Sequence, residues 1–203
     1  MANLTSILGT DQISASRGTI NTNYQNLNAD IVTVNTSIAS LRASILSDND
    51  EPHANLSSNH TQSVAATTVA YPIYYENQDI LDGIGHSSVL NASRIEILEA
   101  GAYLITLAAI TDLTSGTNKK VNIWLAVNSS ILANSNTITT IPNANAEVLV
   151  TIPIVNRFAA GDFFEFLWQA DDTNAKLLAT AAQANPTRPT CPSNIITVSK
   201  IGT

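Results

Sequence analysis

Acidic and amide side chains gather in two short stretches of the sequence, which makes these stretches the first candidates for chemistry. Asp162 and Glu165 lie in one, and Asp171, Asp172 and Asn174 lie in the other. Oxygen-rich loops of this kind can bind Ca²⁺, but the spacing does not match an EF-hand loop. An ordinary Asx-rich turn is the preferred interpretation of the second stretch. A calcium site at Asp171 and Asp172 stays an open alternative.

Two histidines have a spacing that could matter in an oligomer. His53 and His60 lie seven residues apart in a polar segment that reads as a linker. If three chains ran side by side, each position would form a ring of three imidazoles, which is a metal-binding arrangement. Solvated linker histidines are the simpler interpretation, so we expect no bound metal.

The two tryptophans could stack on a sugar ring. Trp124 and Trp168 both lie in apolar, strand-like runs, so packing in a core or an interface is the preferred interpretation. A receptor contact is better placed on exposed loops, because loops carry much of the binding function of rigid scaffolds. The candidate loops are Ser129–Asn134 and Asn143–Ala146.

Motifs of known catalytic mechanisms are missing from the sequence. It has no Gly-x-Ser-x-Gly elbow, no His-Glu-x-x-His and no phosphate-binding glycine loop. Paired carboxylates for glycoside hydrolysis would have to face each other across a cleft, and no spacing here predicts that. We therefore expect neither an enzyme nor a cofactor, and a polysaccharide lyase or hydrolase is the weakest of the functional alternatives.

Composition excludes several partners. The 203 residues carry a net charge of −7, and only 12% of them are charged. Lys119-Lys120 is the only basic pair, so the basic patch of a nucleic-acid binder is missing. An anionic membrane would repel the chain, and no apolar run is long enough for a membrane helix. We expect no nucleic-acid partner and no membrane insertion.

The segment 20–47 has the spacing of a coiled coil. Apolar residues recur at alternating steps of four and three, which is a heptad seam two residues wide. Its members are Ile20, Tyr24, Leu27, Ile31, Val34, Ile38, Leu41 and Ile45. Asn, Thr, Ser and Val make the intrinsic helix propensity poor, so burial against partner chains must stabilise the helix. A single amphipathic helix on its own domain is the alternative, and the seam does not decide between two and three strands.

Turn-forming residues and Pro52 should end this helix, and the following residues to 62 read as a linker. From there the chain shows short apolar runs separated by turn clusters, which predicts an antiparallel sandwich or jelly roll over 63–203. The predicted strands are 64–75, 94–98, 102–111, 121–127, 131–138, 147–155, 162–169, 176–181 and 195–201.

Two of these strands are apolar on both faces. In 102–110 and in 163–168, both alternating sets are mainly apolar: Tyr103, Ile105, Leu107 and Ala109 against Leu104, Thr106, Ala108 and Ile110, and Phe163 and Leu167 against Phe164, Phe166 and Trp168. A sandwich strand with one wet face should alternate with polar residues, so a subunit interface is needed to cover the second face. The residues expected at that interface are Tyr103, Ile105, Phe164, Phe166 and Trp168.

Four motifs of the β region together resemble a known family. They are Ala100-Gly101-Ala102-Tyr103, Ile123-Trp124-Leu125-Ala126-Val127-Asn128, Ala160-Gly161-Asp162-Phe163-Phe164 and Ser193-Asn194-Ile195-Ile196-Thr197. In this order they resemble the trimeric jelly-roll heads of tumour necrosis factor and of complement and collagen-like proteins. The resemblance implies a homotrimer with the two doubly apolar strands close to its three-fold axis. The usual Asn-Gly turn is replaced here by Asn128-Ser129, which leaves the hairpin geometry open.

The stretch Ile13–Tyr24 is similar to the start of many phage fibre and head-decoration proteins. This resemblance implies a structural protein on the virion surface, either a head fibre, a capsid decoration or a short tail fibre. Residues 1–19 would then bind a capsid or tail protein, and the head would contact a host-surface glycan or protein. The alternative is a receptor-binding adhesin or lectin-like trimeric head of a cellular or secreted protein.

Overall fold

The computed structural model describes residues 13–47 and 51–203. They form two compact units that divide between residues 50 and 51. The first unit contains helix α1 (Ile13–Ser47), and the second is an all-β head. The helix begins seven residues earlier than the seam predicts, so residues 13–19 of the expected anchor are helical, while residues 1–12 lie outside the described residues.

Helix α1 contains many residues with weak helix propensity. The hydroxyls of Thr22, Thr33 and Thr36 each donate to the carbonyl four residues earlier, at 2.9–3.1 Å. Such back-bonding satisfies the hydroxyl but does not stabilise a helix. Within the described ranges, no helix is long and apolar enough to cross a membrane.

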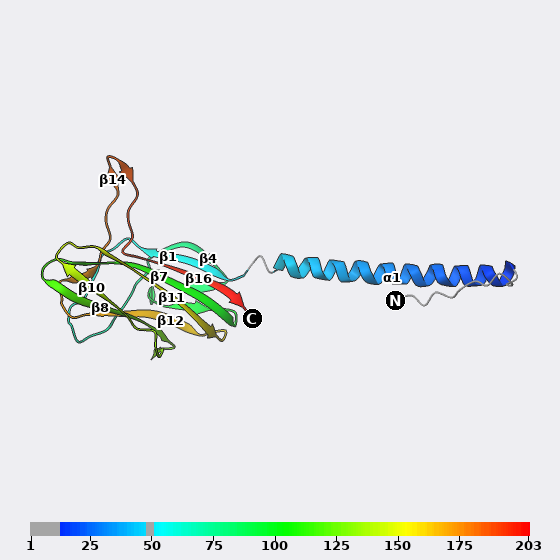
Figure 1. The fold of residues 1–203 in the computed structure, drawn as a ribbon, viewed down its shortest axis with the longest axis horizontal. Helices are drawn as coiled ribbons and strands as arrows, with labels where there is room; N and C mark the ends of the chain where they lie inside the picture. Colours follow the sequence, from blue (N-terminus) through cyan, green and yellow to red (C-terminus); the bar gives the residue numbers. More distant parts are fainter. Residues whose placement is uncertain (1–12, 48–50) are drawn as a thin grey trace. The chain divides into compact units, whose positions relative to one another are not determined.

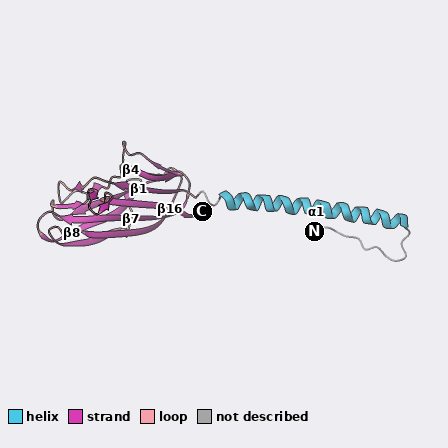
Figure 2. Ribbon diagram, turned by 90° about the horizontal axis from the view of Figure 1, so that it is seen from above, coloured by secondary structure: helices cyan, strands magenta, loops and turns pink. Residues whose placement is uncertain are grey.

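The head is a sandwich of two antiparallel sheets, seen edge-on in Figure 1 and from above in Figure 2. Sheet I consists of β1 (His53–Ser58), β2 (Gln62–Ser63), β4 (Asn77–Asp82), β7 (Gly101–Leu113), β11 (Val148–Phe158), β13 (Ala175–Leu177) and β16 (Asn194–Gly202). Sheet II consists of β3 (Tyr71–Pro72), β5 (Ile84–His86), β6 (Ile95–Ile97), β8 (Thr117–Val127), β9 (Ser130–Ile131), β10 (Thr137–Asn143) and β12 (Phe163–Ala170). A separate hairpin joins β14 (Gln183–Ala184) to β15 (Thr187–Arg188).

The strand pairing is nested in the way that defines a jelly roll. β1 pairs with β16, β6 with β12, β7 with β11 and β8 with β10, all antiparallel. These pairs join eight main strands, which follow each other along the chain as β1, β6, β7, β8, β10, β11, β12 and β16. The first pairs with the eighth, the second with the seventh, the third with the sixth and the fourth with the fifth. The predicted jelly roll is confirmed by this pairing.

Several sequence predictions of strand and linker positions need correction, among them 131–138, which is mostly the turn between β9 and β10, and 176–181, where the strand ends at Leu177. Residues 53–58 were expected in a linker but form β1, whose Ala54 and Leu56 are buried in the core. The segment 77–82 forms β4, which no pattern predicted, and 64–75 contains only the short β3 instead of a continuous strand. β1 and β4 are rich in polar residues, so their apolar pattern is too weak to show in the sequence; pairing with β16 and with each other places them.

A buried lysine fixes the point where the head begins. The Lys200 ammonium donates to the Glu99 carboxylate and lies 3.4 Å from Glu51, and the hydrogen bond to Glu99 raises the pKa of Lys200. The Lys200 backbone N–H also donates to the Pro52 carbonyl at 2.9 Å. Residues 51 and 52 are therefore part of the head rather than of a linker.

The turn between β8 and β9 resolves the question of its hairpin geometry. Asn128 and Ser129 have φ angles of 49° and 66°, and Val127 pairs with Ser130 across the turn. Two central residues with positive φ define a type I′ turn, for which Asn-Gly is the usual sequence. The turn is therefore of the expected type, with a serine in the position that glycine normally occupies.

Candidate self-association surfaces

The heptad seam lies on the surface of α1 in a single chain. Its described members Ile20, Tyr24, Leu27, Ile31, Val34, Ile38 and Leu41 are all exposed. The side chain of Ile45 lies outside the described residues. A row of exposed aliphatic side chains at heptad spacing is what a coiled-coil contact would bury. The alternative, a single amphipathic helix packed on its own domain, stays open.

A second apolar surface lies on the outer side of sheet I, and we call it the outer face. Across β7 and β11, Leu104 lies opposite Val155 and Ile110 opposite Leu149. Leu149 and Val155 are 67% and 62% exposed, and no residue of the face is charged. The face consists of Leu104, Thr106, Ala108, Ile110, Leu149, Thr151, Pro153, Val155, Ile195 and Thr197. A continuous uncharged patch of this kind is typical of a protein–protein interface.

The five head residues expected at the subunit interface have a different position. Tyr103, Ile105, Phe164, Phe166 and Trp168 are each at most 1% exposed within one chain. They point between the sheets and form the centre of the core. They therefore have no surface left for a partner, and on β7 the opposite set of residues forms the outer face.

The second doubly apolar strand, β12, is covered by its own chain. The Arg94 guanidinium lies 4.4 Å from the centre of the Phe163 ring, on the outer side of sheet II. Leu167 is half-buried and pairs with Pro72 of β3. The inference that both strands require a partner chain thus holds for β7 alone.

The hairpin β14–β15 projects from the head. Figure 1 shows it rising on the side of β1, β4 and β16, away from β8 and β12. Every residue from 181 to 189 is exposed, and the hairpin pairs with neither sheet beyond the bridge between Thr180 and Cys191 at its base. A two-stranded hairpin without a core is marginally stable in water. Its position beside the outer face suits a contact with a second chain.

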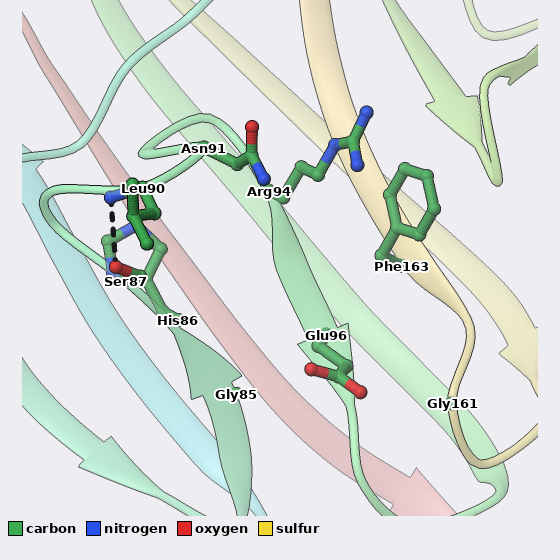
Figure 3. Close-up of a pocket in the computed structure, with 9 residues that line it drawn as sticks. All are labelled: Gly85, His86, Ser87, Leu90, Asn91, Arg94, Glu96, Gly161 and Phe163. Atoms are coloured by element: carbon green, nitrogen blue, oxygen red, sulfur yellow. Dashed lines mark hydrogen bonds between the residues drawn. The ribbon is translucent and has the colours of Figure 1, made fainter.

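A cleft of about 430 Å³ lies at the other end of the head, on sheet II (Figure 3). Arg94 points toward Phe163 in this view, and its Nε lies 3.5 Å from Glu165, which also accepts a 2.6 Å hydrogen bond from Ser93. Burial lowers the pKa of His86, which favours its neutral form. The arginine, its carboxylate partner and the Ser93 hydroxyl are thus bonded to one another within the fold.

The residues considered for metal binding have protein partners. Asp172 accepts from the backbone and side chain of Asn174, both at 2.9 Å, and pairs with Lys119 at 3.0 Å. The Asn174 backbone hydrogen bond is the main cause that lowers the pKa of Asp172 to about 2. His60 Nδ1 lies 2.6 Å from Glu76. In residues 13–47 and 51–203, no three His, Cys, Asp or Glu side chains form a group that could hold a metal.

The two tryptophans lie in different environments, and so do the two candidate loops. Trp168 is a core residue, whereas Trp124 is half-buried on the outer side of sheet II. The loop Ser129–Asn134 borders a cleft that Trp124 also lines, and the loop Asn143–Ala146 does not. Sequence reasoning missed the part of the outer face on β11, although the run Val148–Val155 is apolar on both faces and carries that signal.

Comparison with known proteins gives a similarity of structure alone. No protein-family profile matches the sequence, and no curated protein matches it. A crystal structure of murine APRIL at pH 5.0 is 10% identical, with a TM-score of 0.48, and one at pH 8.5 is 9% identical, with a TM-score of 0.46. Each match covers 74% of this chain and 99% of the other. At this identity and score, the likeness carries no information about function.

Proposed function

We propose that the protein is a homotrimeric stalk-and-head structural protein that acts by attachment and has no catalytic role. The observation that carries this proposal is the apolar surface that one chain leaves exposed on both of its units. The seam of α1 and the outer face of sheet I are each a row or patch of uncharged, largely exposed apolar residues, and contiguous apolar surface of this kind marks interaction sites.

The number of chains rests on two kinds of support. A heptad seam with Ile and Tyr at one set of positions and Leu, Val and Ile at the other fits two or three strands. The sequence resemblance of the head motifs to trimeric jelly-roll heads favours three. A heterologous contact that closes into a ring also satisfies every copy equally, which an open chain of copies would not.

The place of the protein on a virion surface is the finer part of the proposal. It is supported by the resemblance of the stretch Ile13–Tyr24 to phage fibre and decoration proteins. In this proposal the N-terminal segment binds a capsid or tail protein and the head contacts the host. A receptor-binding head of a cellular or secreted protein is the second candidate, favoured by a head that has a complete core of its own.

Mass measurement in solution tests the assembly. We expect a species of three times the 21.5 kDa of one chain, and a stable species of 21.5 kDa at micromolar concentration would overturn the proposal. Cryo-electron microscopy of intact particles tests the location. Density for three chains on the capsid or the tail supports the virion location. A trimer that binds a cell-surface protein and is absent from particles supports the second candidate.

A further inference from the structure

Trp124 lies in a cleft of about 440 Å³ on the outer side of sheet II. Its neighbours along β8, Ile123 and Leu125, are 1% and 0% exposed, so alternation turns the indole outward. Trp124 belongs neither to the core nor to the residues packed against it. The half-buried ring is therefore a platform on the surface of the sheet rather than a core residue.

Amide side chains surround this platform in a fixed arrangement. Asn122 Nδ2 donates to Gln169 Oε1 at 3.0 Å, and Asn136 Nδ2 lies 3.4 Å from Asn122 Oδ1. Gln169 Nε2 donates to the Thr67 and Ala170 carbonyls, both at 2.6 Å, which holds that amide in place and leaves its oxygen as the group that a ligand can use. The register that pairs Asn122 with Gln169 brings these groups together. Oriented amides beside an aromatic ring offer both donors and acceptors to a ligand.

Two polar atoms at this site lack a partner in the described residues. The Trp124 indole Nε1–H has no acceptor and no contact with solvent. The structure likewise gives no donor to Asn136 Oδ1, on the exposed rim of the cleft. A buried donor without an acceptor costs stability. The Trp124 N–H is closed to solvent, so a ligand in the cleft would contact the indole ring and the exposed Asn136 oxygen rather than this N–H.

The lining selects the chemistry of the ligand. No charged side chain lines the cleft, and Ile131 and Leu132 add apolar surface at one side. A phosphate or carboxylate would find no cation, which disfavours nucleic acid and acidic sugars. A purely apolar ligand would leave the amides without partners. A ring with an apolar face and hydroxyls on its edge satisfies both the indole and the amides.

We infer that this cleft binds an uncharged saccharide, with the apolar face of one sugar ring on Trp124 and its hydroxyls on Asn122, Asn136 and Gln169. The inference rests on the proposed attachment function and names its site and ligand class. Sheet II faces away from the outer face and from the projecting hairpin, so self-association leaves the cleft open (Figure 1). Each trimer would present three such sites, and multivalency raises the effective affinity for a surface that carries many glycans.

The test is an array of neutral and anionic glycans probed with the full-length protein, followed by titration with the methyl glycosides of galactose, glucose and N-acetylglucosamine. Trp124→Ala should weaken binding of the neutral sugar by roughly tenfold or more, the loss expected for an aromatic anchor. Asn136→Ala should weaken it less, and Trp124→Phe should retain part of it. Arg94→Ala changes the separate cleft of the same sheet and is the matched control, with unchanged binding.

Three results would overturn the inference: no neutral glycan binds, binding survives Trp124→Ala, or only anionic glycans bind and Arg94→Ala abolishes the signal. Trp168, the only other tryptophan, is buried and reports on folding through its fluorescence. If Trp124→Ala does not fold, loss of binding in the surface variant Asn136→Ala decides the question. A trimer that binds no neutral sugar refutes this inference alone, whereas a monomer that still binds it through Trp124 refutes the proposed assembly alone.

Discussion

If the protein is the proposed trimer, replacing Ile31 with alanine should weaken its assembly without weakening the helix. Ile31 is 50% exposed in a single chain and occupies the middle of the seam. Complete burial of an isoleucine side chain is worth about 1.5–3 kcal/mol, so covering the exposed half contributes roughly 1 kcal/mol. Three chains meet at one layer, which gives about 3 kcal/mol per trimer. Since 1.4 kcal/mol is a factor of ten, the trimer dissociation constant should rise roughly 100-fold.

The neighbouring residue supplies the control. Val32 is 58% exposed but lies outside the seam, so Val32→Ala removes a similar exposed side chain from the wrong face of the helix. Both substitutions replace a β-branched residue with alanine, which raises the intrinsic helix propensity in each case. A loss of assembly in Ile31→Ala therefore cannot come from a weaker helix, and Val32→Ala should assemble like the unmodified protein.

Sedimentation equilibrium over a range of protein concentrations gives the dissociation constant of each variant, and circular dichroism confirms that the helix is present. The reasoning would be refuted by equal behaviour of the two variants. It would equally be refuted by an unmodified protein that stays a single chain across the range, since the seam would then have nothing to bury it.

Three further predictions concern the head. Leu149→Lys places a charge in the outer face and should reduce trimerisation of the full chain while leaving the thermal unfolding of the head nearly unchanged, as measured by the concentration dependence of mass and by calorimetry. Tyr75→Phe should be neutral or stabilise the head by about 1 kcal/mol in urea unfolding, because the buried Tyr75 hydroxyl has no hydrogen-bond partner among the described residues. Tyr103→Phe should destabilise the head by about 1 kcal/mol in the same assay, because the Tyr103 hydroxyl donates to the Glu99 carbonyl at 2.7 Å. The pKa of Asp172 is lowered mainly by the Asn174 backbone hydrogen bond, so this carboxylate stabilises the head at pH values above 3.8, and the stabilisation is lost as the pH falls through about 2. Asp172→Asn should therefore make the unfolding temperature depend less on pH in this acidic range. An unchanged pH dependence would contradict the assignment.

The sequence predicts the regular features of the molecule and misses those that depend on pairing. Heptad spacing alone places the seam, and turn clusters place most of the main strands. The polar strand 53–58 has only Ala54 and Leu56 to bury, so it reads as a linker until β16 provides its partner. Local pattern is therefore sufficient where a segment buries a full face, and insufficient where a segment is held mainly by its backbone.

The two faces of β7 show a different limit. Alternation separates Tyr103 and Ile105 from Leu104 and Thr106, but it cannot say which set lies inside when both are apolar. A physical criterion was available, because the inner set carries the large aromatic side chain and the outer set carries a threonine. Thr106 pairs with Thr197 across the outer face, where Thr197 is exposed.

The sequence indicates some residues of the candidate saccharide site but not that they lie together. The sequence predicts a receptor contact on the loop Ser129–Asn134 and allows sugar stacking on Trp124, but no sequence pattern links the two. The link is tertiary: β10 and β12 flank β8, and their register brings Asn136 and Gln169 to the indole. Residues 14 to 47 positions apart in the chain thus form one surface, which no local pattern encodes.

The chemistry of the two outer surfaces indicates which sheet would contact another copy and which would contact solvent. On sheet I the outer face itself is aliphatic and threonine-rich, so few polar groups would be desolvated when a second copy binds there; the charged groups of the same sheet, such as Arg157 and the Lys176–Asp112 pair, lie outside it. On sheet II the outer surface carries amides, an indole and paired charges, which would be costly to bury against a flat protein surface. The proposed association through sheet I would hide the apolar outer face and leave sheet II in contact with solvent. One sandwich can then hold the assembly together with one side and bind a hydroxyl-rich ligand with the other, because its two sheets separate these requirements.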